Sequence, residues 1–278
     1  MNRTIAQALA AAALEAVDAR ALMRHALGVD TAFLIAHATD ALTAAHSDAF
    51  AALVARRRAG EPVAYITGTR EFYGLEFNVT PAVLIPRPET ELLVEWALEC
   101  ATPDAHARVL DLGTGSGCLA ISIAHARPRA RVTAVDCSAP ALAVAQVNAR
   151  RHNTANAKFL ASDWFSALAG QRFDCIVANP PYIADGDAHL ARGDLRFEPA
   201  GALAAGGDGL DAIRRIVAAA PHYLQARGWL AIEHGYDQAA RCRQLLQAAG
   251  FTQVFSRTDL AGIERISGGR LDAPETKS

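Results

Sequence analysis

The chain has 278 residues, a length that suits one large domain or a medium domain with a small one. Its net charge of -2 at pH 7 gives no overall basic field, which argues against a protein that holds a long nucleic acid. The five cysteines form no Cys-x-x-Cys pair and no cysteine–histidine cluster with zinc spacing, so we predict no metal site and a reducing compartment.

The first segment, residues 1–14, has one arginine and then an alanine-rich stretch, a pattern faintly like a signal peptide. Thr4 and Gln7 interrupt the apolar run, and Glu15 and Asp18 follow it closely. No uncharged run in the chain reaches the roughly 18–20 apolar residues that a membrane helix needs. We therefore predict a first amphipathic helix in a cytoplasmic protein that has no membrane partner.

Residues 1–60 are typical of a small helical domain. Gly28 can end a helix after an apolar-periodic stretch. Ser47 can cap a longer helix that ends near Gly60.

After this helical part, short apolar stretches joined by glycine-containing turns predict β-strands over 62–66, 72–74 and 75–79. Three prolines then break regular structure: Pro81, Pro86 and Pro88. We predict a hairpin linker over residues 61–85, between a helical domain at 1–60 and a main domain at 86–278. In the main domain, Thr90 can cap a first helix that covers 92–98.

Beyond residue 106 strands alternate with helices. The predicted strands are 109–110, 131–135, 157–160, 173–178, 229–233 and 252–255. The predicted helices are 119–125, 140–150, 211–226 and 237–249. This alternation implies βαβ units and an α/β fold with a mainly parallel sheet covered by helices on both faces. The tail after Gly268 is expected to be frayed.

A glycine loop lies between the first strand of this domain and the helix after it: Asp111-Leu112-Gly113-Thr114-Gly115-Ser116-Gly117. The glycines let the backbone turn tightly and let a ligand touch the main chain, and the helix start offers free N–H groups. Asp136 ends the next strand, where an acid can hydrogen-bond ribose hydroxyls. We predict a nucleoside cofactor, with a tight turn alone as the alternative. The compressed glycine spacing and Asp111 favour S-adenosylmethionine.

Asp163 and Trp164 follow the third strand, at the same edge of the sheet. We expect the carboxylate of Asp163 to accept a hydrogen bond from an adenine amino group. The indole of Trp164 can lie against the purine ring. The alternative is a turn aspartate beside a surface tryptophan.

Asn179-Pro180-Pro181-Tyr182 stands at the carboxyl end of a buried strand, where ligands bind in open α/β sheets. Two successive prolines remove two N–H donors and fix two φ angles, so the loop is stiff and rich in carbonyl acceptors. An amide or aromatic amine nitrogen is a poor nucleophile, and acceptors on both N–H bonds would activate and aim it. We predict methyl transfer to such a nitrogen, with an ordinary rigid turn as the alternative.

The glycine loop together with Asn179-Pro180-Pro181-Tyr182 resembles the amino-methyltransferases, a group that includes N6-adenine DNA methyltransferases and glutamine N5-methyltransferases. Further segments resemble the HemK/PrmC release factor glutamine methyltransferases: 68–74, 85–91, 198–210, 233–235 and 259–262. The resemblance spans about residues 15–267. It implies a seven-stranded Rossmann-like S-adenosylmethionine-dependent methyltransferase domain, with a small N-terminal helical domain and a β-hairpin linker.

The resemblance implies methylation of the glutamine in the Gly-Gly-Gln motif of class 1 peptide chain release factors. In that family the asparagine side chain and the first proline carbonyl hold the glutamine amide, which implies these roles for Asn179 and Pro180. Pro181 and Tyr182 would shape the slot. The implied cofactor contacts are the loop of Gly113, Thr114, Gly115, Ser116 and Gly117, with Asp136, Trp164 and Asn179. The helical domain and the hairpin would grip the release factor.

An adenine-N6 nucleic-acid methyltransferase is the alternative, because it shares this acceptor pocket. It would need an excess of lysine and arginine for phosphate contacts. Residues 1–75 contain seven arginines and also seven acidic residues, so we expect no nucleic-acid partner. A cofactor-binding sensor without catalysis is a third possibility. The intact site at Asn179 argues against it.

Overall fold

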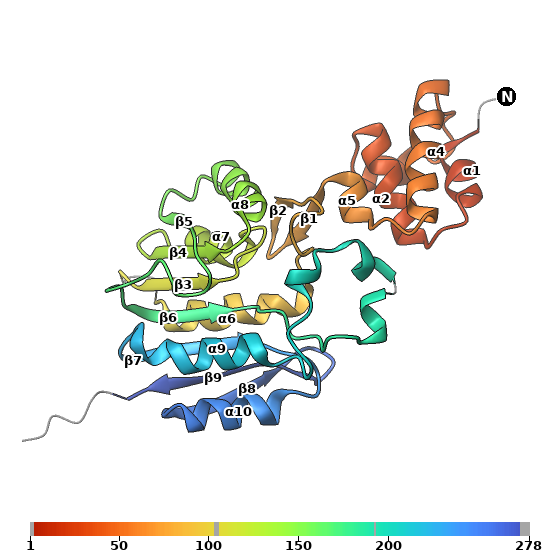
Figure 1. Cartoon of the computed structure of the whole chain (residues 1–278). Helices are drawn as coiled ribbons and strands as arrows, with labels where there is room; N and C mark the ends of the chain where they lie inside the picture. Colours follow the sequence, from red (N-terminus) through yellow and green to blue (C-terminus); the bar gives the residue numbers. More distant parts are fainter. Residues whose placement is uncertain (1–2, 103–105, 192, 273–278) are drawn as a thin grey trace, which may run out of the picture. The chain divides into compact units, whose positions relative to one another are not determined.

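The computed structural model describes residues 3–102, 106–191 and 193–272. The chain forms two compact units by its contacts. One contains Met1–Thr69 and Ala191–Phe197, and the other contains Arg70–Leu190 and Glu198–Ser278. Figure 1 draws the chain from red at the N-terminus to blue at the C-terminus. None of the helices in the described ranges is long and apolar enough to cross a membrane.

The first unit is helical. Its α-helices are α1 (Ile5–Ala11), α2 (Ala16–Leu27), α3 (Thr31–Ala36), α4 (Ala44–Arg58) and α5 (Val63–Thr67). Leu22, Met23 and Phe50 lie at the centre of its apolar core. Thr4 and Gln7 are the polar residues that interrupt the first apolar run. They form a reciprocal capping box at the start of α1.

The helix ends in this unit follow capping chemistry. Gly28 ends α2 in the left-handed conformation at φ +66°, which confirms its predicted role. The predicted cap at Ser47 is wrong, because Thr43 caps α4 and its hydroxyl accepts from the His46 N–H at 3.2 Å. The two alanines and the histidine that follow Thr43 are compatible with a helix. The helix therefore begins after Thr43 and not after Ser47.

The strand predicted over 62–66 is wrong, because residues Val63–Thr67 form the short helix α5. Pro62 precedes its first turn, and Gly68 ends it in the left-handed conformation at φ +75°. Ile66 packs into the helical core. These two boundary residues outweigh the β propensity of the short apolar run.

A β-hairpin follows, made of β1 (Thr69–Phe72) and β2 (Leu75–Asn78). Tyr73 and Gly74 form its two-residue turn and both have positive φ, as tight hairpin turns require. The strand predicted over 72–74 is therefore mostly turn. Phe72 and Phe77 are buried with ring centroids 6.1 Å apart, in the core of the second unit.

Within the described residues, the second unit is built on a seven-stranded sheet in the order β5-β4-β3-β6-β7-β9-β8. The strands are β3 (Arg108–Leu112), β4 (Arg131–Asp136), β5 (Ala157–Ala161), β6 (Phe173–Ala178), β7 (Leu224–Glu233), β8 (Phe251–Thr258) and β9 (Glu264–Leu271). The first five are parallel, and β9 runs antiparallel to both β7 and β8. The predicted α/β class with a mainly parallel sheet is confirmed. The strand order reverses between β3 and β6, where open α/β sheets bind ligands.

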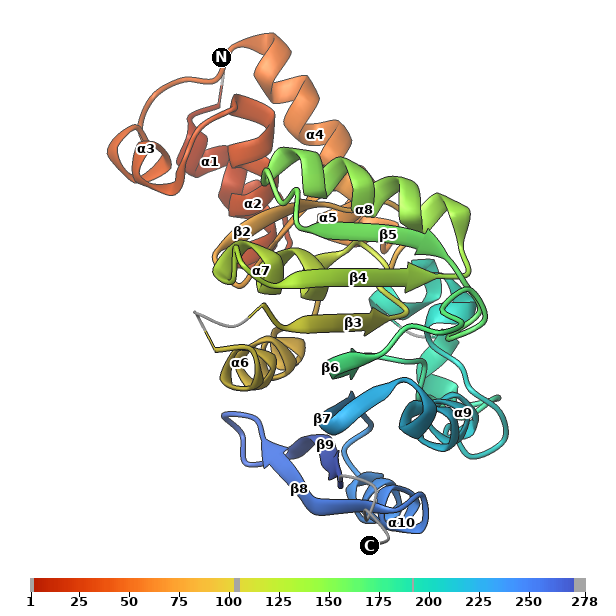
Figure 2. The same ribbon diagram turned by 90° about the vertical axis from the view of Figure 1, so that its left-hand side faces the viewer.

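Helices cover both faces of this sheet (Figures 1 and 2). One face carries α6 (Glu91–Cys100), α7 (Cys118–Ala126) and α8 (Ala139–Arg151). The other carries α9 (Asp211–Ala219) and α10 (Ala239–Ala248). Val109 packs into one core and its neighbour Leu110 into the other, so adjacent residues of β3 are both apolar. Short 3₁₀ turns lie at Pro88–Thr90, Ala188–Ala191, Gly193–Phe197, Ala200–Ala202 and Ala220–His222.

Two predictions about the C-terminal third are wrong. The helix predicted over 211–226 ends at Ala219, since Pro221 lies in a 3₁₀ turn and β7 begins at Leu224. The tail predicted to fray after Gly268 belongs to β9 as far as Leu271.

Gly268 and its neighbour Gly269 make β9 look like a loop in the sequence. A β-carbon at Gly268 would lie 2.5 Å from the carbonyl oxygen of Leu230 and 2.6 Å from the ring of Phe255. The glycine is therefore required because a strand backbone and an aromatic ring approach it closely.

Candidate active site

A cavity of about 510 Å³ opens where β3, β4, β5 and β6 end. Small-molecule sites commonly have roughly 300–1,000 Å³. The predicted site residues on its wall are Gly113, Thr114, Gly115, Ser116, Asp136, Asp163, Trp164, Asn179 and Pro181. The structure therefore brings both predicted groups, the cofactor loop and the acceptor loop, to one cavity. Gly117, Pro180 and Tyr182 are not among its lining residues.

Four residues of the glycine loop line this cavity: Gly113, Thr114, Gly115 and Ser116. The N–H groups of Gly113 and Thr114 both donate to the carbonyl oxygen of Val135, each at 2.9 Å, so the loop is tied to β4. Gly115 has φ +54°, and a β-carbon there would meet no atom within 4 Å. The main chain at Gly115 is therefore open to a ligand.

Gly117 has another task. With φ +84°, a β-carbon there would lie 2.8 Å from Cδ1 of Ile121 and 3.1 Å from Cβ of Ala145. Gly117 thus lets α7 and α8 approach each other closely. Its predicted contact with a cofactor stays a prediction.

Asp136 is held by backbone donors. Its Oδ2 accepts from the N–H of Gly115 at 2.9 Å, and its Oδ1 accepts from the N–H of Ser138 at 2.8 Å. Each carboxylate oxygen can accept more than one hydrogen bond, so both keep capacity for ligand hydroxyls. The carboxylate is therefore oriented before any ligand arrives.

Trp164 and Asp163 form another part of the wall. A β-carbon on Gly113 would lie 3.5 Å from the Trp164 ring, so the indole stands beside the glycine loop. The Trp164 carbonyl accepts from the Ser162 hydroxyl at 2.8 Å. Oδ2 of Asp163 pairs with Arg215 at 2.9 Å, so this carboxylate already has one cationic partner at the rim.

Asp111 lies buried beneath the glycine loop. Its Oδ2 accepts from the Thr114 hydroxyl at 2.6 Å, while Oδ1 has no partner in the described part of the chain. Burial raises the pKa of Asp111 to about 7. Asp111 does not line the cavity, so the fit of a cofactor depends on the lining residues. Asp136 offers acceptors for ribose hydroxyls, Trp164 offers a ring for a purine, and the main chain at Gly115 is open, which together fit S-adenosylmethionine.

The acceptor loop is connected to the protein interior through Thr90. Nδ2 of Asn179 donates to the Thr90 hydroxyl at 3.0 Å, and this hydroxyl donates to Oε2 of Glu233 at 2.7 Å. Thr90 occupies the N-cap position of α6, where it was predicted, but its side chain makes no capping hydrogen bond and contacts these partners instead.

Glu233 ends β7 and is buried. Its second oxygen, Oε1, accepts from the Tyr182 hydroxyl at 3.2 Å. Burial raises the pKa of Glu233 to about 7 despite these two hydrogen bonds. Burial and the nearby Glu233 carboxyl also raise the pKa of Tyr182. Sequence reasoning gave Glu233 no role, although an acid at the end of a buried strand is the same signal that identified Asp136.

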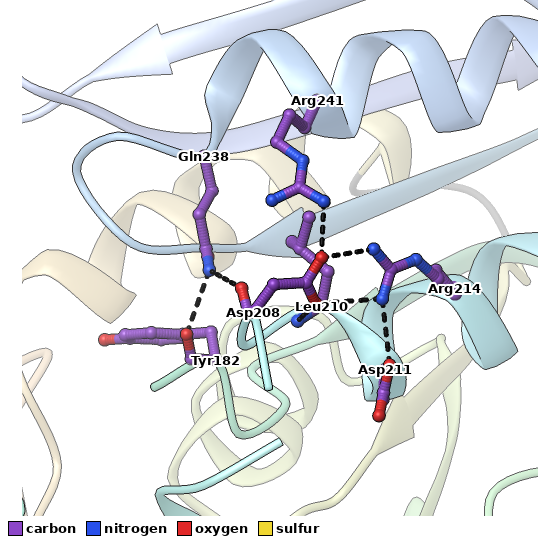
Figure 3. A network of polar contacts seen from close by, with 7 residues as sticks. All are labelled: Tyr182, Asp208, Leu210, Asp211, Arg214, Gln238 and Arg241. Carbon is purple, nitrogen blue, oxygen red and sulfur yellow. Dashed lines mark hydrogen bonds and ion pairs between the residues drawn. The ribbon is translucent and has the colours of Figure 1, made fainter. Parts of the chain in front are cut away.

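The backbone that leaves the acceptor loop is also held (Figure 3). Nε2 of Gln238 donates to the carbonyl of Tyr182 at 3.0 Å and to that of Asp208 at 3.4 Å. Gly209 has φ +71°, and a β-carbon there would lie 2.3 Å from the Tyr182 carbonyl oxygen. A glycine at this position lets the two backbone segments touch.

Asp208 anchors that second segment between two helices (Figure 3). Its carboxylate accepts from Arg214 of α9, at 2.9 Å for Oδ1, and from Arg241 of α10. The two guanidinium groups hold the pKa of Asp208 well below its usual range. The turn is closed by the Leu210 N–H, which donates to Oδ1 at 3.2 Å.

Arg87 adds a cation to the cavity wall. It forms an ion pair with Glu198, whose side chain is buried and whose Oε2 also accepts from the Ile85 N–H at 3.0 Å. Among the described residues, no group of three or more histidine, cysteine or acidic side chains could hold a metal ion.

Comparison with known proteins identifies similar families over both units. Residues 89–259 match the family described as Methyltransferase small domain, and residues 3–68 match the PrmC N-terminal domain. The chain is 58% identical over 274 residues to the release factor glutamine methyltransferase of Burkholderia pseudomallei, with 96% of each chain covered. It is 56% identical over 264 residues to the protein of that name from Bordetella pertussis, which covers 95% of this chain and 97% of the relative.

Among solved structures, a 16S rRNA methyltransferase of T. thermophilus (RsmC) in complex with AdoMet and guanosine is similar, with a TM-score of 0.55. The match covers 73% of this chain and 49% of that one at 23% identity. This likeness shows the fold alone.

Proposed function

The chain belongs to the family of release factor glutamine methyltransferases, and we propose its reaction from that premise. It transfers a methyl group from S-adenosylmethionine to N5, the side-chain amide nitrogen, of the glutamine in the Gly-Gly-Gln motif of class 1 peptide chain release factors. One observation supports the chemistry above all others. The cofactor loop at Gly113 to Ser116 and the acceptor residue Asn179 line the same cavity.

The cofactor supplies an electrophilic methyl group on its sulfonium when it is bound. The protein's own groups bind and orient the reactants. Asp136 would accept from the ribose hydroxyls of the bound cofactor, and Trp164 would hold its adenine. Oδ1 of Asn179 and the Pro180 carbonyl accept from the two N–H bonds of the substrate amide. The new N–C bond forms as the S–C bond breaks, and one amide proton leaves to water.

The substrate is a folded protein, and a small cavity cannot by itself select one glutamine among many. We assign docking of the release factor to the helical part at residues 1–60 and the hairpin linker at 61–85. Catalysis belongs to residues 86–278. Since release factors act on ribosomes in the cytoplasm, we also place the enzyme there.

The direct test is incubation with cofactor labelled at the methyl group and with separate samples of release factor, DNA and RNA. We expect label on the release factor, at the Gly-Gly-Gln glutamine by mass spectrometry. A release factor with that glutamine changed to alanine is the matched control and should stay unlabelled. Label on DNA or RNA instead would support the adenine-N6 alternative and overturn the proposal.

A further inference from the structure

Both ends of the Asn179-Pro180-Pro181-Tyr182 loop are tied to one buried carboxyl group. Tyr182 donates directly to Oε1 of Glu233, at 3.2 Å. Asn179 reaches Oε2 through the Thr90 hydroxyl, over contacts of 3.0 and 2.7 Å. Thr90 and Glu233 are both 2% exposed, so water does not compete for these contacts. Neither residue lies within the loop that they hold.

The direction of these hydrogen bonds has a chemical consequence. A hydroxyl has one proton to donate. When Thr90 gives that proton to the Glu233 carboxylate, the atom of Asn179 that faces Thr90 must be a donor, which is Nδ2. The other atom of this amide, Oδ1, is then free to accept, and it has no hydrogen-bond partner among the described residues.

We propose that Glu233 and Thr90 are positioning residues that set the amide orientation of Asn179, so that its oxygen and not its NH₂ group meets the substrate nitrogen. This inference rests on the proposed function, because Glu233 and Thr90 would orient Asn179, the proposed acceptor of the substrate amide. If the side-chain amide of Asn179 were not held in one orientation, some molecules would present its NH₂ group to the NH₂ group of the substrate. Those molecules could not hold the substrate nitrogen.

The charge state of Glu233 controls the direction of the relay. A Glu233 protonated on Oε2 would donate to Thr90, which would then donate to Oδ1 of Asn179 and turn the amide around. Glu89 opposes ionisation of Glu233, and Arg265 of β9 favours it. Tyr182 and Cys118 also face it, and both stay neutral because their pKa values are raised.

With a pKa of about 7, Glu233 is increasingly ionised as the pH rises through neutrality. The rate of methyl transfer should therefore rise with pH and reach a plateau above neutrality. This rise of the rate with pH comes from a group of the enzyme, since the glutamine amide of the substrate does not titrate in this range.

The test measures the single-turnover rate at saturating cofactor and release factor, from pH 6 to pH 8.5. Thr90→Val keeps the shape of the side chain but breaks the relay. We expect a rate about 10–100-fold lower and a flat pH profile. Thr90→Ser restores the hydroxyl and should recover the rate and the slope. Cofactor affinity is measured beside the rate, because Thr90 lines the cavity and Asn179 is an implied cofactor contact. In Thr90→Val the single-turnover rate at saturating cofactor should fall by a larger factor than the affinity.

Two further variants separate ionisation from packing. Glu233→Gln cannot ionise, so its profile should lose the part of the slope that belongs to Glu233, whatever its plateau; any slope that Asp111 contributes should remain. Tyr182→Phe removes the other hydrogen bond to Glu233 and should keep the slope. Thr90→Val with a rate within twofold of wild type, or Glu233→Gln with the wild-type slope, would overturn the relay.

A measurement without substrate keeps this inference separate from the proposed function. The side-chain amide signal of Asn179 can be assigned in the NMR spectrum of ¹⁵N-labelled protein by its loss in Asn179→Ala. It should shift with pH near neutrality in the wild type and not in Thr90→Val. If the wild type fails to methylate release factor, the proposed function is wrong while this titration still decides the relay. A signal that does not respond to pH in the wild type would contradict the relay itself.

Discussion

At the scale of single residues, Asn179 connects the cavity wall to the protein interior. Asn179→Ala removes the proposed acceptor of the substrate NH₂ and leaves the glycine loop and Asp136 in place. We expect the single-turnover rate to fall by about 10²-fold or more, as for loss of a polarising group in other enzymes. Cofactor affinity, measured by calorimetry, should fall far less. A variant with near-normal turnover would refute the role.

Asp136 is predicted to act on the cofactor alone. Asp136→Ala removes the acceptor for ribose hydroxyls and also leaves the N–H groups of Gly115 and Ser138 without their partner. We expect S-adenosylmethionine to bind about 1.5–3 kcal/mol more weakly by calorimetry, the range for a hydrogen bond to a charged group. Asp136→Asn keeps the shape of the side chain and one acceptor oxygen. Its affinity for S-adenosylmethionine should lie between those of the wild type and Asp136→Ala. Unchanged affinity in the alanine variant would place Asp136 outside the site.

Single polar residues could be predicted where they directly follow a buried strand, as Asp136 and Asn179 do. The partnership of Thr90 with Glu233 could not, because 143 positions separate the two residues. Thr90 also stands before an apolar helical pattern, where a threonine usually caps the helix. Only the folded sheet brings it to the end of β7.

At the scale of secondary-structure elements, two glycines of one loop should respond differently to the same change. Gly117→Ala pushes a methyl group into Ile121 and Ala145 at a φ of +84°, so we expect a loss of about 1–3 kcal/mol of unfolding free energy. Gly115→Ala meets no atom within 4 Å and should cost only the backbone strain of its positive φ. Its methyl group stands at the cavity and should weaken cofactor binding.

Urea unfolding and calorimetry on both variants check this pair. We expect the larger loss of unfolding free energy for Gly117→Ala. For Gly115→Ala we expect the larger loss of cofactor affinity relative to its loss of unfolding free energy. The opposite ranking would mean that the two glycines have exchanged roles.

Elements with one dominant signal were predictable. The central strands β3 and β6 are mostly buried and contain adjacent apolar residues, and Gly28 marks a helix end. Elements decided by contacts were not: α5 depends on the packing of Ile66, and β9 contains glycines that only the neighbouring Phe255 explains. The alternating pattern therefore yielded six strands, and the seventh came from family resemblance alone.

At the scale of the whole molecule, recognition and chemistry should be separable. A chain that begins at Arg70 lacks the helical segment but keeps all predicted site residues. We expect it to bind S-adenosylmethionine and to lose most of its kcat/KM against intact release factor, because docking energy is lost. Against a short Gly-Gly-Gln peptide, the full-length and shortened chains should be similarly slow.

Removing residues 1–69 also takes away the partners of the segment Ala191–Phe197. In the intact chain Arg57 pairs with Asp194 at 2.8 Å, and Arg196 donates to the carbonyl of Ala59 at 2.9 Å. Solubility and cofactor affinity of the shortened chain must therefore match the full-length protein before rates are compared. If the soluble short chain methylates release factor as fast as the full-length enzyme, the docking role is wrong.

The position of β9 has a consequence for how the protein is made. It is the last strand of the described chain, yet it lies inside the sheet between β7 and β8. Before β9 has been synthesised and has paired, β7 presents an unpaired edge and β8 has no neighbour in the sheet. Such edges invite pairing with other chains. A stop codon only a few residues before Glu264 should therefore yield an aggregating polypeptide, although every residue of the cavity would already have been synthesised.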